Sequence, residues 1–318
     1  ADGSIYKGNF KNDKMVGQGQ YIVPNGDCYE GVFTEDLKSG KGVIYYYNGD
    51  RYIGEWVDGR RHGQGKLEYK EGGYYEGQWA MDKRNGHGRW EGPKGESYAG
   101  EWLDNERHGK GEYKDANEHY SGEWSNNLKN GEGRCVYPDG SVYQGEWKNG
   151  MKHGNGVFTF HDGSSYKGQF KDDKYHGKGV ETWADGSKFE GDYDMGIKRG
   201  KGKFVWKGGA WYEGEFQNNE ISGYGVHEWP SGKRYKGYWR NNMMHGKGVL
   251  DYGDGRKYTG EFVDDKKHGY GEFDWKDGKK YKGQWEKGKR HGVGVYVTED
   301  GKERKGQWRQ GKLMKWLE

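Results

Sequence analysis

An aromatic residue recurs every 23 residues along almost the whole chain, and no other feature limits the possible folds so strongly. The repeat starts are Tyr6, Tyr29, Tyr52, Tyr75, Tyr98, Tyr120, Tyr143, Tyr166, Phe189, Tyr212, Tyr235, Tyr258 and Tyr281. One interval is 22 residues long, between Tyr98 and Tyr120, and a fourteenth unit starts at Arg304, where the aromatic residue is lost. This period indicates one small structural unit repeated in tandem, each copy burying its apolar face against its neighbours.

Each unit carries the same pattern, which we number from its first aromatic residue as position 0. Glycine at position 2 and a second aromatic residue at position 4 alternate with polar residues, so the rings and the glycine share one face of a strand. A Gly-x-Gly pair at positions 11 and 13, such as Gly63 and Gly65, opens a second strand. Asn-Gly or Asp-Gly, as in Asn25-Gly26, is typical of tight turns and precedes most repeat starts. Each unit is therefore predicted to be a β-hairpin.

The predicted fold is all-β: an elongated, single-layer, twisted antiparallel β-meander of about 14 hairpin repeats. The array is expected to be one continuous domain over residues 1–318, with the last unit incomplete. Rings are expected to pack into the space that the glycines leave, which offsets the roughly 0.5 to 1 kcal/mol that a strand loses at each glycine. At about 10 Å per hairpin the sequence predicts a rod of roughly 130 Å.

Composition fits this fold better than a globular core, because only 30% of the chain is hydrophobic while 62 residues are glycine. The chain has neither a long apolar run nor an apolar N-terminal signal, so we expect a soluble, intracellular protein. Cys28 and Cys135 fall about four repeats apart, roughly 40 Å, which is too far for a disulfide bond. Residues 233–318 carry 22 Lys and Arg against 13 Asp and Glu, so this end is the basic part of the chain.

The repeat resembles the membrane occupation and recognition nexus (MORN) repeat, as in Tyr52-Ile-Gly-Glu-Trp56 followed by His62-Gly-Gln-Gly65. The resemblance covers essentially the whole chain. It implies an elongated β-meander that acts as a scaffold or docking rod, as in radial spoke heads of cilia, junctophilins, protozoan cytoskeletal proteins and regulatory regions of phosphatidylinositol phosphate kinases. The histidine of the pattern is replaced in several repeats, and these irregular units are candidate partner-specific surfaces: Val16, Ser39, Asn85, Asn130, Arg199 and Ser222.

No pattern in the sequence points to catalysis, a cofactor or a metal. The histidines at position 10, such as His62 and His108, should lie about 10 Å apart in neighbouring hairpins, which is too far to share one zinc ion. We interpret them as turn residues that hydrogen-bond the loop backbone. The glycine pairs lack the Gly-Lys-Ser/Thr sequence of a phosphate-binding loop, and a chain with 50 acidic residues lacks a strongly basic nucleic-acid footprint.

Two surfaces are candidate partner sites. The first is a partner-docking aromatic groove made by the position 4 tryptophans Trp56, Trp79, Trp102, Trp124, Trp147, Trp239, Trp285 and Trp308. The second is a basic edge for an anionic partner or lipid, made by Arg60, Arg61, Lys266, Lys267, Lys289 and Arg290.

The function expected from the resemblance and these surfaces is a non-enzymatic scaffold or protein-docking rod in a cytoskeletal or ciliary (axonemal) assembly. The alternative is a phospholipid-binding or membrane-targeting region, for example of a larger phosphatidylinositol phosphate kinase. The expected location is the cytoskeleton or cilium, with membrane association under the alternative. Other proteins are the expected partners, anionic phospholipid is the alternative, and a homodimer through the C-terminal repeats is left open by the sequence.

Overall fold

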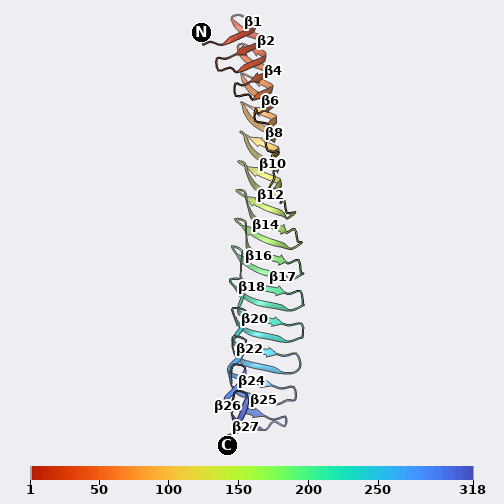
Figure 1. Ribbon diagram of the computed structural model, residues 1–318, viewed down its shortest axis with the longest axis vertical. Coiled ribbons are helices and arrows are strands. Elements are labelled where there is room, and N and C mark those ends of the chain that lie inside the picture. The colour runs from red at the N-terminus through yellow and green to blue at the C-terminus, as the bar shows by residue number, and fades with distance from the viewer. Residues whose placement is uncertain (1, 318) are drawn as a thin grey trace. The chain divides into compact units, whose positions relative to one another are not determined.

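The computed structural model describes residues 2–317, which divide into two compact parts between His161 and Asp162. From here on, these two parts are called the first and the second unit, and a single hairpin is called a repeat. Each unit is a meander of antiparallel strands in which every strand pairs with the next along the chain (Figure 1). The predicted all-β hairpin fold is therefore confirmed. The repeat pattern of the sequence continues across the boundary without an insertion. The single continuous domain stays a prediction. No helix long and apolar enough to span a membrane occurs between residues 2 and 317.

Between residues 2 and 161 the strands are β1 (Ile5–Lys11), β2 (Lys14–Ile22), β3 (Cys28–Thr34), β4 (Leu37–Tyr45), β5 (Arg51–Val57), β6 (Arg60–Glu68), β7 (Tyr74–Ala80), β8 (Lys83–Glu91), β9 (Ser97–Leu103), β10 (Glu106–Lys114), β11 (His119–Ser125), β12 (Leu128–Val136), β13 (Val142–Lys148) and β14 (Met151–Thr159). Between residues 162 and 317 they are β15 (Ser165–Lys171), β16 (Lys174–Thr182), β17 (Lys188–Asp194), β18 (Ile197–Val205), β19 (Trp211–Gln217), β20 (Glu220–Glu228), β21 (Arg234–Arg240), β22 (Met243–Asp251), β23 (Lys257–Val263), β24 (Lys266–Asp274), β25 (Lys280–Glu286), β26 (Lys289–Val297), β27 (Glu303–Arg309) and β28 (Lys312–Trp316).

The glycines at positions 2 and 13 line up across the strands and leave room for the ring at position 0. Gly54 lies opposite Gly42 on one side and Gly65 on the other. A Cβ atom added to Gly54 would lie only 2.6 Å from both Gly65 Cα and Tyr52 Cζ, because the Tyr52 ring already fills that space. Any larger residue at these positions would therefore displace the ring or separate the strands.

The rings form the core of each unit as one continuous row of edge-to-face contacts. Tyr52 is fully buried, and its ring centroid lies 5.3 Å from that of Trp56 in its own repeat and 5.3 Å from that of Trp79 in the next. Edge-to-face pairs of this kind add roughly 0.5 to 1.5 kcal/mol each beyond the area that they bury. The hydroxyl at position 0 donates a hydrogen bond to the backbone carbonyl of position 3, as from Tyr75 to Gln78 at 2.9 Å. Each repeat is thus joined to the next through shared rings.

The strands reverse at both edges of the sheet, whereas the turn signals of the sequence identified only one edge. The Asn25-Gly26 loop links one hairpin to the next, with the Gly26 amide donating to the Val23 carbonyl at 2.9 Å. Inside each hairpin a second, two-residue turn has both residues at positive φ, as at Met81 and Asp82 (φ 49° and 68°). Positive φ at both central residues is the mark of a type I′ turn, which suits the twist of antiparallel strands.

These inner turns also join neighbouring repeats. Asp82 Oδ1 accepts a hydrogen bond from the Arg61 backbone amide at 3.0 Å, and Asn105 Oδ1 accepts one from the Arg84 amide at 2.8 Å. In the short interval of 22 residues, Asp115 Oδ1 accepts from the amides of Asn117 and Glu118, both at 2.8 Å, and closes a tighter loop. Short polar side chains therefore fix the spacing between hairpins where the rings do not reach.

Candidate docking surfaces

The tryptophans predicted to line a docking groove lie in the core instead. The exposed fractions of Trp56, Trp79, Trp102, Trp124, Trp147, Trp239, Trp285 and Trp308 are only 3% to 7%. Each of these rings except Trp308 is covered by the position 0 ring of the preceding repeat as well as by that of its own, as Tyr52 and Tyr75 cover Trp79. Trp308, whose repeat starts with Arg304, contacts Tyr281 and Trp316 instead. A partner could not reach the faces of these rings, so the structure corrects the prediction that they form an open groove.

Basic side chains at position 9 lie over this ring layer. The Arg61 guanidinium is 4.3 Å from the centroid of Trp79, and Arg84 has the same distance to Trp102. Arg61 is also held by Asp82, whose Oδ1 lies 3.1 Å from its Nε. Cation–π contacts of partly desolvated groups contribute roughly 1 to 2 kcal/mol each, so these cations belong to the core and not to a free surface.

The predicted basic edge therefore separates into two sets. Arg60, Lys266 and Lys289 at position 8 are exposed. Their neighbours at position 9 lie over rings: besides Arg61, the Arg290 guanidinium is 5.6 Å from the Tyr281 centroid, and Lys267 Nζ is 4.3 Å from the Phe273 centroid. Burial lowers the pKa of the Lys267 amine to about 8. Adjacent residues of a strand point to opposite faces, so a sequence doublet of basic residues does not make a paired surface.

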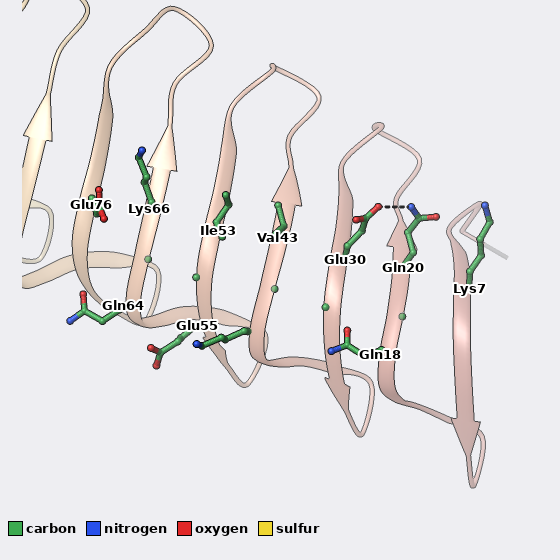
Figure 2. Close-up of a pocket in the computed structure, with 16 residues that line it drawn as sticks. Lys7, Gln18, Gln20, Glu30, Val43, Ile53, Glu55, Gln64, Lys66 and Glu76 are labelled. Atoms are coloured by element: carbon green, nitrogen blue, oxygen red, sulfur yellow. Dashed lines mark hydrogen bonds between the residues drawn. The ribbon is translucent and has the colours of Figure 1, made fainter.

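A groove does occur, but on the opposite face of the sheet. In the first unit it has a volume of about 890 Å³, and its floor is the glycine backbone of several strands. Figure 2 shows the side chains that rise along it from successive strands; they come mainly from positions 1, 12 and 14. The set is Lys7, Gln18, Gln20, Glu30, Lys41, Val43, Ile53, Glu55, Gln64, Lys66 and Glu76. Three lysines and three glutamates here balance in charge.

The second unit has a corresponding groove of about 1050 Å³ at the same repeat positions. Lysines and acids again face each other across neighbouring strands, with Lys203 Nζ 3.4 Å from Glu213 Oε2. Unlike the first groove, this one is lined at one end by an aromatic side chain, Tyr224, beside Val226.

Some groove-face acids and amides also stabilise the sheet. Glu101 Oε1 accepts a hydrogen bond from the Lys110 amide at 2.9 Å, and Gln78 Oε1 accepts one from the His87 amide at 2.7 Å. These position 3 side chains pair with the backbone beside the bulge at each position 11 glycine, where φ is positive, as at Gly109.

The position 10 histidines lie beside the inner turns. The ring of His176 accepts a hydrogen bond from the Met195 amide at 3.4 Å, as predicted for this position. The buried Nδ1 atoms of His62 and His108 have no hydrogen-bond partner among the described residues, so the predicted bond to the loop backbone is not a general feature of these histidines. Others face carboxylates, with His245 Nδ1 3.4 Å from Asp264 and His291 Nδ1 3.2 Å from Glu286. Within residues 2–317 no three His, Cys, Asp or Glu side chains gather in a metal-binding group.

Repeated hairpins, a shared ring core and a polar groove in each unit define a repeat scaffold built from a single-layer sheet. The chain belongs to the MORN repeat family, because the model described as MORN repeat matches it in thirteen consecutive segments. These are residues 6–28, 29–51, 52–74, 75–97, 98–119, 120–142, 143–165, 166–188, 189–211, 212–234, 235–255, 258–280 and 281–303. None of the curated proteins matches the sequence.

Solved structures share only a loose likeness. The TCP10 domain of Danio rerio CPAP in complex with a STIL peptide is 13% identical, with 86% of this chain and 95% of that chain covered and a TM-score of 0.22. The Drosophila melanogaster SAS-4 TCP domain is 14% identical over 57% of this chain and 86% of that chain, with a TM-score of 0.25. A streptogramin B lyase is 12% identical, with 94% of this chain and 78% of that chain covered and a TM-score of 0.13. At such scores these structures carry no argument about function.

Proposed function

We propose that the protein is a non-enzymatic scaffold that docks other proteins in a cytoskeletal or ciliary assembly. The observation that carries the proposal is the groove on the face of each unit opposite the rings, where side chains change from repeat to repeat above a constant backbone floor. A partner segment laid along such a groove would meet a new set of side chains about every 10 Å. This arrangement suits recognition of a long segment through many small contacts.

The cytoskeletal or ciliary setting rests on the resemblance to radial spoke and cytoskeletal MORN proteins. The lipid-binding alternative receives less support, because Arg61, Lys267 and Arg290 are engaged with rings. Each basic residue near an anionic membrane contributes about 1 kcal/mol, so losing half of a six-residue set weakens that alternative considerably.

Proximity labelling in the native cell, with the full chain tagged, tests the proposal when it is combined with two variants of strand β5. Ile53 lines the first groove and is 38% exposed, whereas Val57 of the same strand is 43% exposed and lies outside the groove. We expect labelling of axonemal or cytoskeletal proteins that Ile53→Asp reduces and Val57→Asp preserves. Labelling of membrane proteins without cytoskeletal ones would instead favour the lipid alternative and remove the proposal.

A further inference from the structure

One stretch of the groove face differs in kind from the rest. Positions 3 and 12 lie on this face in every repeat, and in the first unit they are polar or charged except at Val32. In the second unit the same positions carry Tyr224, Tyr238 and Tyr270, followed by Val293. We call these four residues the tyrosine patch. The change is confined to strands β20, β21, β24 and β26.

The patch is open to solvent, in contrast to the core rings behind it. The exposed fractions are 43% for Tyr224, 53% for Tyr238, 63% for Tyr270 and 43% for Val293. Tyr224 and Tyr238 face each other across β20 and β21, with ring centroids 5.3 Å apart at an interplanar angle of 71°. Large apolar side chains gathered on one exposed surface, at positions that are otherwise polar, mark an interaction site.

Lysines without ion-pair partners surround the patch. Lys236, Lys247, Lys282 and Lys305 project from β21, β22, β25 and β27 at positions 1 and 12 of the same face. Within residues 2–317 none of these four amines lies within 4 Å of a carboxylate. From β20 to β27, positions 1, 3, 12 and 14 of this face carry these four lysines and only two acids, Glu261 and Glu272. Glu272 is 3.4 Å from Lys280 Nζ. The net charge at these positions around the tyrosines is therefore positive.

We propose that the tyrosine patch binds an acidic protein segment that carries aliphatic or aromatic anchor residues. The inference rests on the proposed docking function and names the chemistry and the place of one partner. The anchors would contact Tyr224, Tyr238 and Tyr270, and the acidic residues between them would pair with the flanking lysines. Tyr238 and Tyr270 are three strands apart, or roughly 14 Å, and Val293 is about 10 Å further on. An extended segment spans these gaps in about three or four residues.

The details of the patch favour protein over single-stranded nucleic acid. Nucleic-acid platforms present flat aromatic faces for base stacking in a continuous basic groove. Here the Tyr224 and Tyr238 rings meet edge to face, and Glu261 and Glu272 interrupt the row of lysines. Val226, Val249 and Val295 of the neighbouring row supply methyl groups, which suit aliphatic anchors better than bases.

The experiment measures binding of a fluorescein-labelled acidic peptide to the full chain by fluorescence anisotropy. The peptide has leucine at every third position and glutamate or aspartate elsewhere, because three extended residues span about 10 Å, the width of one hairpin. The test variant is the triple substitution Tyr224→Ser, Tyr238→Ser and Tyr270→Ser. Its matched control is the triple substitution Gln18→Ser, Val32→Ser and Gln64→Ser, which occupies the same positions with the same spacing in the first unit. The replaced side chains are exposed, apart from the half-buried Val32, so both variants should fold.

We expect the tyrosine variant to bind the peptide at least about tenfold more weakly than the unaltered chain, and the control to stay within about twofold. A separate double variant, Lys236→Glu with Lys282→Glu, should also bind the acidic peptide more weakly than the unaltered chain. A peptide with lysine in place of its acids should not bind. A labelled oligouridine should bind more weakly than the acidic peptide.

Three results would overturn the inference: no peptide binding up to about 1 mM, equal binding by the tyrosine variant, or tighter binding of the oligouridine at the same tyrosines. These outcomes differ from a failure of the docking function itself. If cellular labelling finds cytoskeletal neighbours while the peptide result is negative, only the patch is wrong. If labelling finds none, the scaffold proposal is lost.

Discussion

A single methyl group at a core glycine should loosen the sheet locally, and Gly100→Ala is the sharpest case. A Cβ atom at Gly100 would lie 2.5 Å from the carbonyl oxygen of Lys110 and 2.7 Å from Tyr98 Oη, and it would also overlap Gly111 Cα. Ordinary contacts between such atoms are roughly 3.4 to 4 Å. Two of the three obstacles are backbone, so relief requires a change in the spacing of β9 and β10.

The expected loss follows from two opposing effects. Overpacking costs roughly 1 to 3 kcal/mol, and here the upper half of that range applies because backbone must move. Alanine recovers about 0.5 to 1 kcal/mol relative to glycine by restricting the unfolded chain. The net destabilisation is therefore about 1 to 2 kcal/mol. Since a repeat array opens locally, this should appear as roughly five- to thirtyfold faster amide exchange in β9 and β10.

Hydrogen exchange of the full chain, read by mass spectrometry, is the measurement. Gly208→Ala is the matched control, because Gly208 has ordinary φ and an added Cβ there would meet no atom within 4 Å. This control should be neutral or slightly more stable. If the amide-exchange rates of β9 and β10 in Gly100→Ala stayed within a factor of two of those in the unaltered chain, the idea that the ring occupies the space of the missing Cβ would be refuted.

Three further predictions concern the rings, the inner turns and the buried lysine. Tyr75→Phe should cost about 1 kcal/mol in urea unfolding by removing the 2.9 Å hydrogen bond from its hydroxyl, and Phe189→Tyr should gain a similar amount. Asp82→Ala should cost about 1 to 2 kcal/mol and expose the Arg61 amide to exchange, while Asp82→Asn should cost less than about 0.5 kcal/mol because it keeps the acceptor. Burial lowers the pKa of Lys267 to about 8, so above that pH the unfolded chain binds more protons than the folded chain. The free energy of unfolding of the unaltered chain, measured relative to that of Lys267→Met, should therefore rise between pH 8 and 10 and stay level below pH 8.

The fold could be predicted from the sequence because the same pattern repeats. The alternation of Tyr52, Gly54 and Trp56 fixes which face is apolar, and glycine at position 2 is explained by the ring that covers it. The sequence predicted a loop between the two strands of each repeat but not its turn type, because the residues of the inner turn vary in type, as at Met81 and Asp82. A motif search built on Asn-Gly and Asp-Gly does not detect a turn defined by backbone conformation alone.

The candidate site was predicted less well, because a repeating aromatic residue looks the same in a core and in a binding groove. The sequence placed Trp79 on a face with other rings, but only the structure shows that Tyr52, Tyr75 and Arg61 cover it. Burial depends on the neighbouring repeats, which a single-strand pattern does not describe. By contrast, the change from polar residues to Tyr224 and Tyr238 at positions 12 and 3 could have been found by comparing the repeats with one another.

Because rings are shared between neighbouring repeats, the N-terminal edge of the sheet differs from its C-terminal edge. Tyr29 covers both Phe33 of its own repeat and Trp56 of the next, so a position 4 ring is enclosed only when a repeat precedes it. Phe10, which has no such neighbour, is 62% exposed, whereas the later position 4 rings of the first unit are 2% to 5% exposed. A shortened array would thus carry one unsatisfied aromatic ring at its N-terminal edge wherever it was cut. Designed fragments of the protein should therefore gain in solubility when that single ring is replaced by a polar residue.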